Sequence, residues 1–101
     1  MRMILFFDLP SVTKKEIREY TKFVKLLKKE GFIRMQESVF SKLALNQSAV
    51  NSVMIELKKK LPPEGVISVL TITEKQFSSI EHILGGFETD VIMSESKVIK
   101  L

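Results

Sequence analysis

The chain has 101 residues, of which 45% are hydrophobic and 28% are charged. That is enough for one packed core and too little for two domains of ordinary size. It contains no cysteine, which excludes disulfide frameworks, thiolate nucleophiles and zinc held by cysteine. The apolar run at residues 3–7 is interrupted by Asp8 and Pro10, so it is too short for a signal peptide or a membrane span. We therefore expect a cytoplasmic protein that does not associate with a membrane.

The net charge of +4 is unevenly distributed. Residues 1–60 carry 13 Lys and Arg against 6 acids, whereas residues 61–101 carry 3 against 6. A basic half favours a polyanionic partner. The acidic end is explained either by solubility alone or by a basic protein partner.

The first two elements have clear boundaries. Apolar residues at both alternating sets of positions in residues 2–9 predict a strand buried on both faces. Pro10 ends the ladder of that strand, and Thr13 with Glu16 three residues later forms a capping box that begins a helix. Apolar residues then recur at helical spacing as far as Gly31, which is a natural C-terminal stop.

The middle of the chain predicts a strand pair, a helix and a further strand. Residues 32–45 read as two short strands, and no Asn-Gly pair marks their junction, so we expect a kinked or bulged connection. A second helix, capped by Asn46 or Ser48, ends before a Pro-Pro pair. Residues 66–72 then predict another strand that is apolar on both faces.

The chain after residue 72 gives conflicting local signals. Thr73 with Gln76 can cap a helix, yet Ile80, His82 and Leu84 alternate as in a strand. The local sequence therefore does not decide between a helix and a strand. Two further short strands are expected near the C-terminus, at residues 90–93 and 97–101.

This order of elements predicts an α+β fold, a ferredoxin-like βαββαβ sandwich at residues 1–85 with one or more additional C-terminal strands. In that fold both helices cover one face of the sheet, and the other face should be polar. Here the first and fourth strands are apolar on both faces, so the second face requires a cover. A second copy stacked sheet to sheet supplies one, and we predict a homodimer. Residues 86–101 form an extension that we expect to contact a partner.

Asp8 follows the apolar first strand and would stand at the edge of the sheet. One interpretation is a solvated loop acid. If the strand lies near a two-fold axis, two Asp8 side chains approach each other, which favours a shared proton or a bridging divalent cation. Oxygen ligands with retained waters suit Mg²⁺ or Mn²⁺ better than zinc.

Cations on the first helix recur every three or four residues and form one stripe about 22 Å long, comparable to several successive phosphates of a duplex. The stripe consists of Lys14, Arg18, Lys22, Lys25 and Lys29. It is either a solvated helix face or a phosphate-binding surface, and the scarcity of neighbouring acids favours phosphate. Arg34 lies among strand residues and is an edge-strand charge or a group that reaches a phosphate or a carboxylate. His82 is the single histidine and is interpreted as structural or solvated.

Several blocks of the sequence resemble the signature of the CRISPR-associated Cas-two family, especially its type II members. The blocks are Phe-Phe-Asp-Leu-Pro at residues 6–10, the capped basic helix, Gly31-Phe32, Arg-Met-Gln-Glu-Ser-Val-Phe at residues 34–40, and Leu-Thr-Ile-Thr-Glu-Lys-Gln-Phe at residues 70–77. Together they span most of the chain in the right order. The sequence departs from the family at Phe7, where many relatives have tyrosine.

The resemblance implies a homodimer that bridges two dimers of the larger CRISPR integrase and supports captured duplex DNA along its basic faces. It also implies a metal-dependent endonuclease activity on RNA or duplex DNA, with Asp8 as the catalytic residue and ligand of Mg²⁺ or Mn²⁺. We expect the scaffold role to be the physiological one. The resemblance also favours a fifth strand at residues 78–84 over the local helix signal.

A general ferredoxin-like RNA-binding module outside CRISPR is the alternative function. Such modules stack bases on exposed sheet aromatics, but the sequence lacks their Lys/Arg-Gly-Phe-Gly/Ala-Phe run, and a dimer sealed through the sheet would exclude it. A regulatory dimer that binds a small metabolite is a third interpretation, for which the sequence offers no glycine-rich anion-binding loop.

Overall fold

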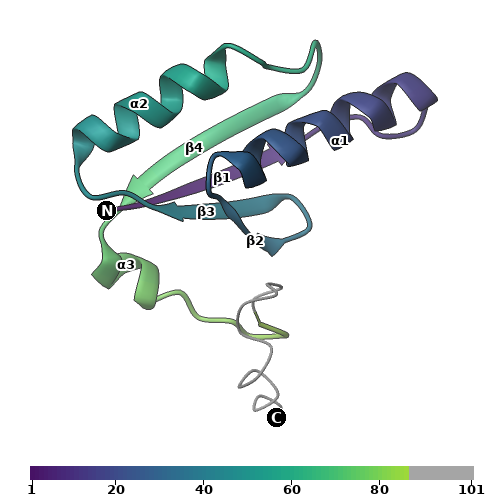
Figure 1. Cartoon of the computed structure of the whole chain (residues 1–101). Coiled ribbons are helices and arrows are strands. Elements are labelled where there is room, and N and C mark those ends of the chain that lie inside the picture. The colour runs from purple at the N-terminus through teal and green to yellow at the C-terminus, as the bar shows by residue number, and fades with distance from the viewer. Residues whose placement is uncertain (87–101) are drawn as a thin grey trace.

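A four-stranded antiparallel sheet is the frame of the structure, a computed structural model in which residues 1–86 are described. The strands are β1 (Arg2–Asp8), β2 (Ile33–Gln36), β3 (Val39–Leu43) and β4 (Val66–Ile72), in the spatial order β2-β3-β1-β4. Helix α1 (Lys14–Lys29) connects β1 to β2, α2 (Gln47–Lys58) connects β3 to β4, and α3 (Glu74–Ser78) follows β4. Figure 1 shows α1 and α2 on one side of the sheet and α3 away from both of them. This arrangement confirms the predicted α+β ferredoxin-like sandwich.

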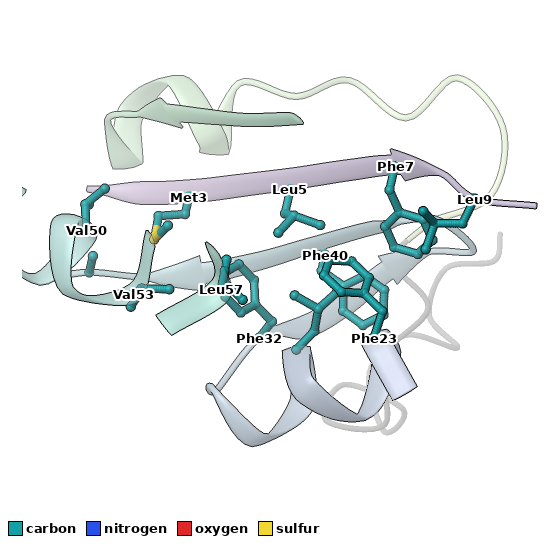
Figure 2. Packing of buried hydrophobic residues seen from close by; sticks show 12 residues of the cluster. Met3, Leu5, Phe7, Leu9, Phe23, Phe32, Phe40, Val50, Val53 and Leu57 are labelled. Carbon is teal, nitrogen blue, oxygen red and sulfur yellow. The ribbon is translucent and has the colours of Figure 1, made fainter. Parts of the chain in front are cut away.

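The core lies between the sheet and the two long helices. Strand β1 is central, and its residue Leu5 pairs with Phe40 of β3 on one side and with β4 on the other. The side chains of Met3, Leu5 and Phe7 all point from β1 into the core, and none is more than 7% exposed. Figure 2 shows them packed toward Phe23 of α1 and Leu57 of α2. One alternating set of β1 side chains therefore builds the core.

An aromatic cluster fixes α1 over the C-terminal end of β1. The ring of Phe7 meets Tyr20 edge-on at 5.7 Å and Phe23 edge-on at 5.4 Å. It also stacks on Phe40 of β3, with ring centroids 6.0 Å apart. Such pairs each contribute about 0.5–1.5 kcal/mol beyond the burial of their surface. The end of β1 is therefore held firmly against α1 and β3.

The caps of both long helices follow the sequence prediction. The Thr13 hydroxyl accepts a hydrogen bond from the Glu16 backbone N–H at 3.1 Å, and the Glu16 carboxylate accepts one from the Thr13 N–H at 3.0 Å. Of the two cap residues considered for α2, Asn46 caps the helix, because its side chain accepts from the Ala49 N–H at 2.9 Å, and Ser48 lies within α2.

The connection between β2 and β3 is bulged, as the absence of a glycine pair predicted. The pairing register shifts between Arg34 and Gln36, and Gln36 then pairs with Val39. The turn is also joined to β1, because the Phe7 N–H donates a hydrogen bond to the Ser38 carbonyl at 3.1 Å.

The fifth strand expected at residues 78–84 is wrong for the described chain, which forms α3 and then irregular backbone. Thr73 and Gln76 exchange two hydrogen bonds of 3.0 and 2.9 Å in a capping box. This cap satisfies backbone N–H groups locally, whereas a strand needs a neighbouring edge to pair with. The strands expected at residues 90–93 and 97–101, and all but the first residue of the expected extension, lie outside the described residues. Within residues 1–86, no helix has the length and apolar composition needed to cross a membrane.

Candidate nucleic-acid interface

The sheet face opposite α1 and α2, called here the open face, is apolar and exposed. Strand alternation places Ile4 and Phe6 of β1 on it, with Leu43 of β3 and Leu70 of β4 beside them. Phe6 is 44% exposed, and Leu43 and Leu70 are each 54% exposed. The second apolar set of β1, which the sequence predicts to be buried, therefore has no complete cover within the described chain.

Asp8 lies at the rim of the open face. It is the last residue of β1, pairs with Val66 of β4, and has an exposed side chain. By strand alternation it belongs to the same set as Ile4 and Phe6. Within residues 1–86, no three His, Asp or Glu side chains are grouped so that they could hold a metal ion. Asp8 therefore belongs to no such group of three within the described chain.

Gly65 determines how closely the loop before β4 passes the end of β1. Its φ of +113° is one that side chains disfavour. A Cβ at this position would lie 2.8 Å from the carbonyl oxygen of Asp8 and 2.5 Å from the side chain of Leu9. Only glycine allows this approach without a shift of the loop or of the strand end that carries Asp8.

The five predicted phosphate-binding cations of α1 lie on one exposed face of the helix. At 3.6 residues per turn they fall within an arc of roughly 80°, on the side away from the buried Phe23 and Leu27. All five side chains are exposed. The only ion pair that they make within residues 1–86 is between Lys22 and Glu19, at 3.7 Å. The stripe is therefore accessible and almost uncompensated.

Arg34 lies apart from Asp8. It pairs with Phe40, whose side chain is in the core, so Arg34 is on the helix side of the sheet, whereas Asp8 belongs to the open face. Its guanidinium lies 5.1 Å over the ring of Phe40. Its Nε is buried and has no hydrogen-bond partner within the described chain. The structure therefore does not bring Arg34 and Asp8 into one site.

A hydrogen bond that the sequence did not predict joins α1 to the β2–β3 turn. The Tyr20 hydroxyl donates to Glu37 at 3.0 Å. Burial raises the pKa of Tyr20, and the hydrogen bond and charge of Glu37 raise it further. The Tyr20 ring also contacts Phe7, so this hydrogen bond adjoins the aromatic cluster at the end of β1. Nothing local in the sequence predicted Glu37 beside Tyr20.

A second unpredicted contact attaches α3 to the start of β1. The Arg2 guanidinium donates two hydrogen bonds to the Glu74 carboxylate, at 2.9 and 2.8 Å. It also lies 4.2 Å over the ring of Phe77. The hydrogen bond from Arg2 is the main reason that the pKa of Glu74 is lowered. Arg2 and Glu74 are 72 positions apart in the chain, so no local pattern could reveal the contact.

Comparison with known proteins settles the family. A model of the family described as CRISPR associated protein Cas2 matches residues 1–80. The chain belongs to the Cas2 family. It is 43% identical to a protein of Treponema denticola over the full length of both chains, and 46% identical to one of Streptococcus mutans over all of this chain and 93% of that one. Both relatives are named CRISPR-associated endoribonuclease Cas2.

A solved structure described as "Crystal structure of cas2" shares the fold of this Cas2-family chain. The match has a TM-score of 0.50 and 19% sequence identity, and it covers 83% of this chain and 98% of the other. At this identity the likeness supports the architecture alone.

We predict that Tyr20→Phe lowers the free energy of unfolding at neutral pH by about 0.5–1.5 kcal/mol, because Glu37 loses its donor. The raised pKa of Tyr20 stabilises the folded state below the unfolded value of 10.0, and this contribution is lost as the pH rises above it. As the pH rises above that value, the free energy of unfolding should therefore fall less in the variant than in the parent protein. Tyr20 is the only tyrosine, so ultraviolet titration of folded and urea-unfolded protein measures its pKa directly. Equal midpoints in the two states would contradict the assignment.

Proposed function

We propose that this Cas2-family chain is a CRISPR adaptation protein, a homodimeric scaffold that binds duplex DNA and bridges two integrase dimers during spacer acquisition. A metal-dependent endonuclease activity on RNA or duplex DNA is its second role. The observation that carries the proposal is the stripe of five exposed cations on α1. The names of the relatives support a nuclease role, because they describe endoribonucleases.

The stripe suits a duplex backbone better than a compact anion. Its cations extend along about 22 Å of helix instead of converging on one point. Binding of this kind neutralises phosphates and releases counterions, so it depends strongly on salt and little on base sequence. A scaffold for captured DNA of varied sequence requires that behaviour.

The open face supports the dimer. An uncovered patch of large apolar side chains is unusual on a monomeric protein, and a two-fold axis lets the same patch cover itself. Phe6, Leu43 and Leu70 would be buried in such a contact. Asp8 stands at the rim of this face, so one carboxylate from each copy could face a shared cation.

Two Asp8 carboxylates with waters form an all-oxygen ligand set, which fits Mg²⁺ or Mn²⁺. A cation bound there would polarise a phosphate and lower the pKa of a bound water. The role of Asp8 is to hold that cation as a charged oxygen ligand. Scaffolding needs only shape and positive charge, so the two roles are separable.

Neutralising Lys14, Arg18, Lys22 and Lys25 together should weaken duplex binding with little loss of stability, since all four side chains are exposed. The slope of log K against log salt should become shallower by roughly 0.9 for each DNA phosphate that the variant no longer neutralises. Fluorescence anisotropy over a salt series measures both quantities. A variant that neutralises Lys28 and Lys75, which lie off the stripe, is the control. An unchanged salt slope in the fourfold variant would assign the stripe to a merely solvated helix face.

Asp8→Asn should abolish Mg²⁺- or Mn²⁺-dependent cleavage of RNA and duplex DNA, while duplex binding and spacer integration with the integrase persist. The amide keeps the shape of the side chain but removes the charge that holds a cation. Cleavage and integration are assayed on the same preparation, with Glu81→Gln, an exposed acid that lies outside the sheet and the helices, as the control. Loss of integration in a folded and assembled Asp8→Asn protein would overturn the scaffold role.

The general RNA-binding module is the alternative function, and Phe6 is the observation that favours it. Its ring is on the sheet and 44% exposed in the single chain, as a base-stacking aromatic must be. The same ring would be buried in the proposed dimer. The oligomeric state therefore distinguishes the two functions.

A further inference from the structure

An apolar groove lies on the helix side of the molecule, between α1 and the end of α2. One hollow of about 310 Å³ is lined by Phe23, Met54 and Val69 among others. A second, of about 410 Å³, adjoins it, because both are lined by Phe23, Leu61 and Pro62. Leu61 is 54% exposed. We call the two hollows together the α1–α2 groove.

Lysines form much of the rim of this groove. Lys58 lines the first hollow, and Lys22 and Lys60 border the groove on α1 and on the loop after α2. The acids on the rim are Glu19 and Glu64, and Glu19 is already paired with Lys22 at 3.7 Å. Lys58 and Lys60 make no ion pair within residues 1–86. The rim therefore carries an excess of positive charge.

The cations of the two helices act in one electrostatic field. The hydrogen bond and charge of Lys59 are the main reasons that the pKa of Glu56 is lowered, and the charges of Lys60 and Lys29 lower it further. Lys29 belongs to α1 and Lys60 follows α2, so the two helices present positive charge to the same region.

We propose that the α1–α2 groove binds a segment of a protein partner in which an apolar side chain is flanked by carboxylates. The apolar side chain would lie against Met54 and Leu61, and the carboxylates would face Lys58 and Lys60. This combination of apolar anchor and charged rim is typical of specific protein recognition. The inference does not depend on duplex binding, because Lys22 alone belongs to both the stripe and the rim, and the proposed carboxylate contacts use Lys58 and Lys60.

A nucleic-acid ligand fits the groove less well. Phosphates would interact favourably with the lysines, but they would make no favourable contact with the apolar floor. Unpaired bases stack on exposed aromatic faces, and the one aromatic side chain that lines the groove, Phe23, is only 2% exposed. The floor is otherwise aliphatic, with methionine, leucine, isoleucine and proline, and suits an apolar side chain.

The test uses the full chain and three short synthetic peptides. One peptide is acidic with an apolar centre (Asp-Glu-Phe-Leu-Glu-Asp), one replaces the centre by Ser-Ser, and one replaces the acids by lysines. Anisotropy of labelled peptide measures affinity, and backbone amide shifts of ¹⁵N-labelled protein locate the site. We expect the first peptide to bind and to shift amides around Leu61 and Met54, and the other two to bind at least about tenfold more weakly.

Two pairs of variants separate specific binding from general effects. Leu61→Glu should lower the affinity for the first peptide at least about tenfold. Ile55→Glu should not lower it, because Ile55 is similarly exposed, at 58%, but does not line the groove. Lys60→Glu should also lower the affinity for the first peptide, and Lys75→Glu on α3 should leave it unchanged. Retained duplex affinity of Leu61→Glu shows that the variant is folded and that the two surfaces are independent.

Three results would overturn the inference. They are equal binding of the three peptides, equal weakening by Leu61→Glu and Ile55→Glu, and amide shifts outside the groove. Duplex DNA that shifts the groove amides, and loses affinity in Leu61→Glu, would assign the groove to nucleic acid instead. Failure of the cation stripe to bind DNA would leave the peptide result unaffected.

Discussion

Strand β1 is apolar on both of its alternating sets of side chains, and this constraint determines the rest of the structure. One set, with Met3, Leu5 and Phe7, is buried against α1 and α2. The other set, with Ile4 and Phe6, points to the open face. A central strand of this kind needs cover on both sides, and within the described residues only one side has complete cover. The proposed homodimer follows from that imbalance.

The same strand determines where the functional groups lie. Asp8 ends β1 on the open-face side, so its chemistry depends on what covers that face. The cation stripe lies on the outer surface of α1, on the other side of the sheet, and the α1–α2 groove lies beside it. The proposed polyanion surface, dimer contact and groove therefore lie on largely different parts of the molecule, and Lys22 is shared by the stripe and the rim of the groove. A scaffold that must hold several partners at once requires such a separation.

Local sequence patterns predicted the elements whose signals are complete within a few residues. The capping box of Thr13 and Glu16 is one such signal, and the three- and four-residue spacing of the cations predicted one exposed stripe on α1. The resemblance to the Cas2 family was likewise sufficient for the fold. Asp8 could be placed at the end of a strand, because Pro10 marks where the strand must stop.

Contacts between distant residues could not be predicted from the sequence. The hydrogen bond between Tyr20 and Glu37 depends on the path of the bulged β2–β3 turn, and that between Arg2 and Glu74 on the return of the chain to the start of β1. The segment after β4 was mispredicted as a strand, since the resemblance favoured extended chain there and the local capping box of Thr73 favoured α3. The position of Arg34 on the helix side also depends on strand register, which a sequence pattern does not fix.

Sedimentation equilibrium at micromolar concentration tests the central claim, that the open face is covered by a second copy. The account predicts one species near twice 11.6 kDa. It also predicts a monomer for Phe6→Glu, which places a charge on the open face, and an unchanged dimer for Val12→Glu, which alters a position 87% exposed and outside the sheet. A parent protein that sediments as a monomer, or a Phe6→Glu variant that remains dimeric, would contradict the account.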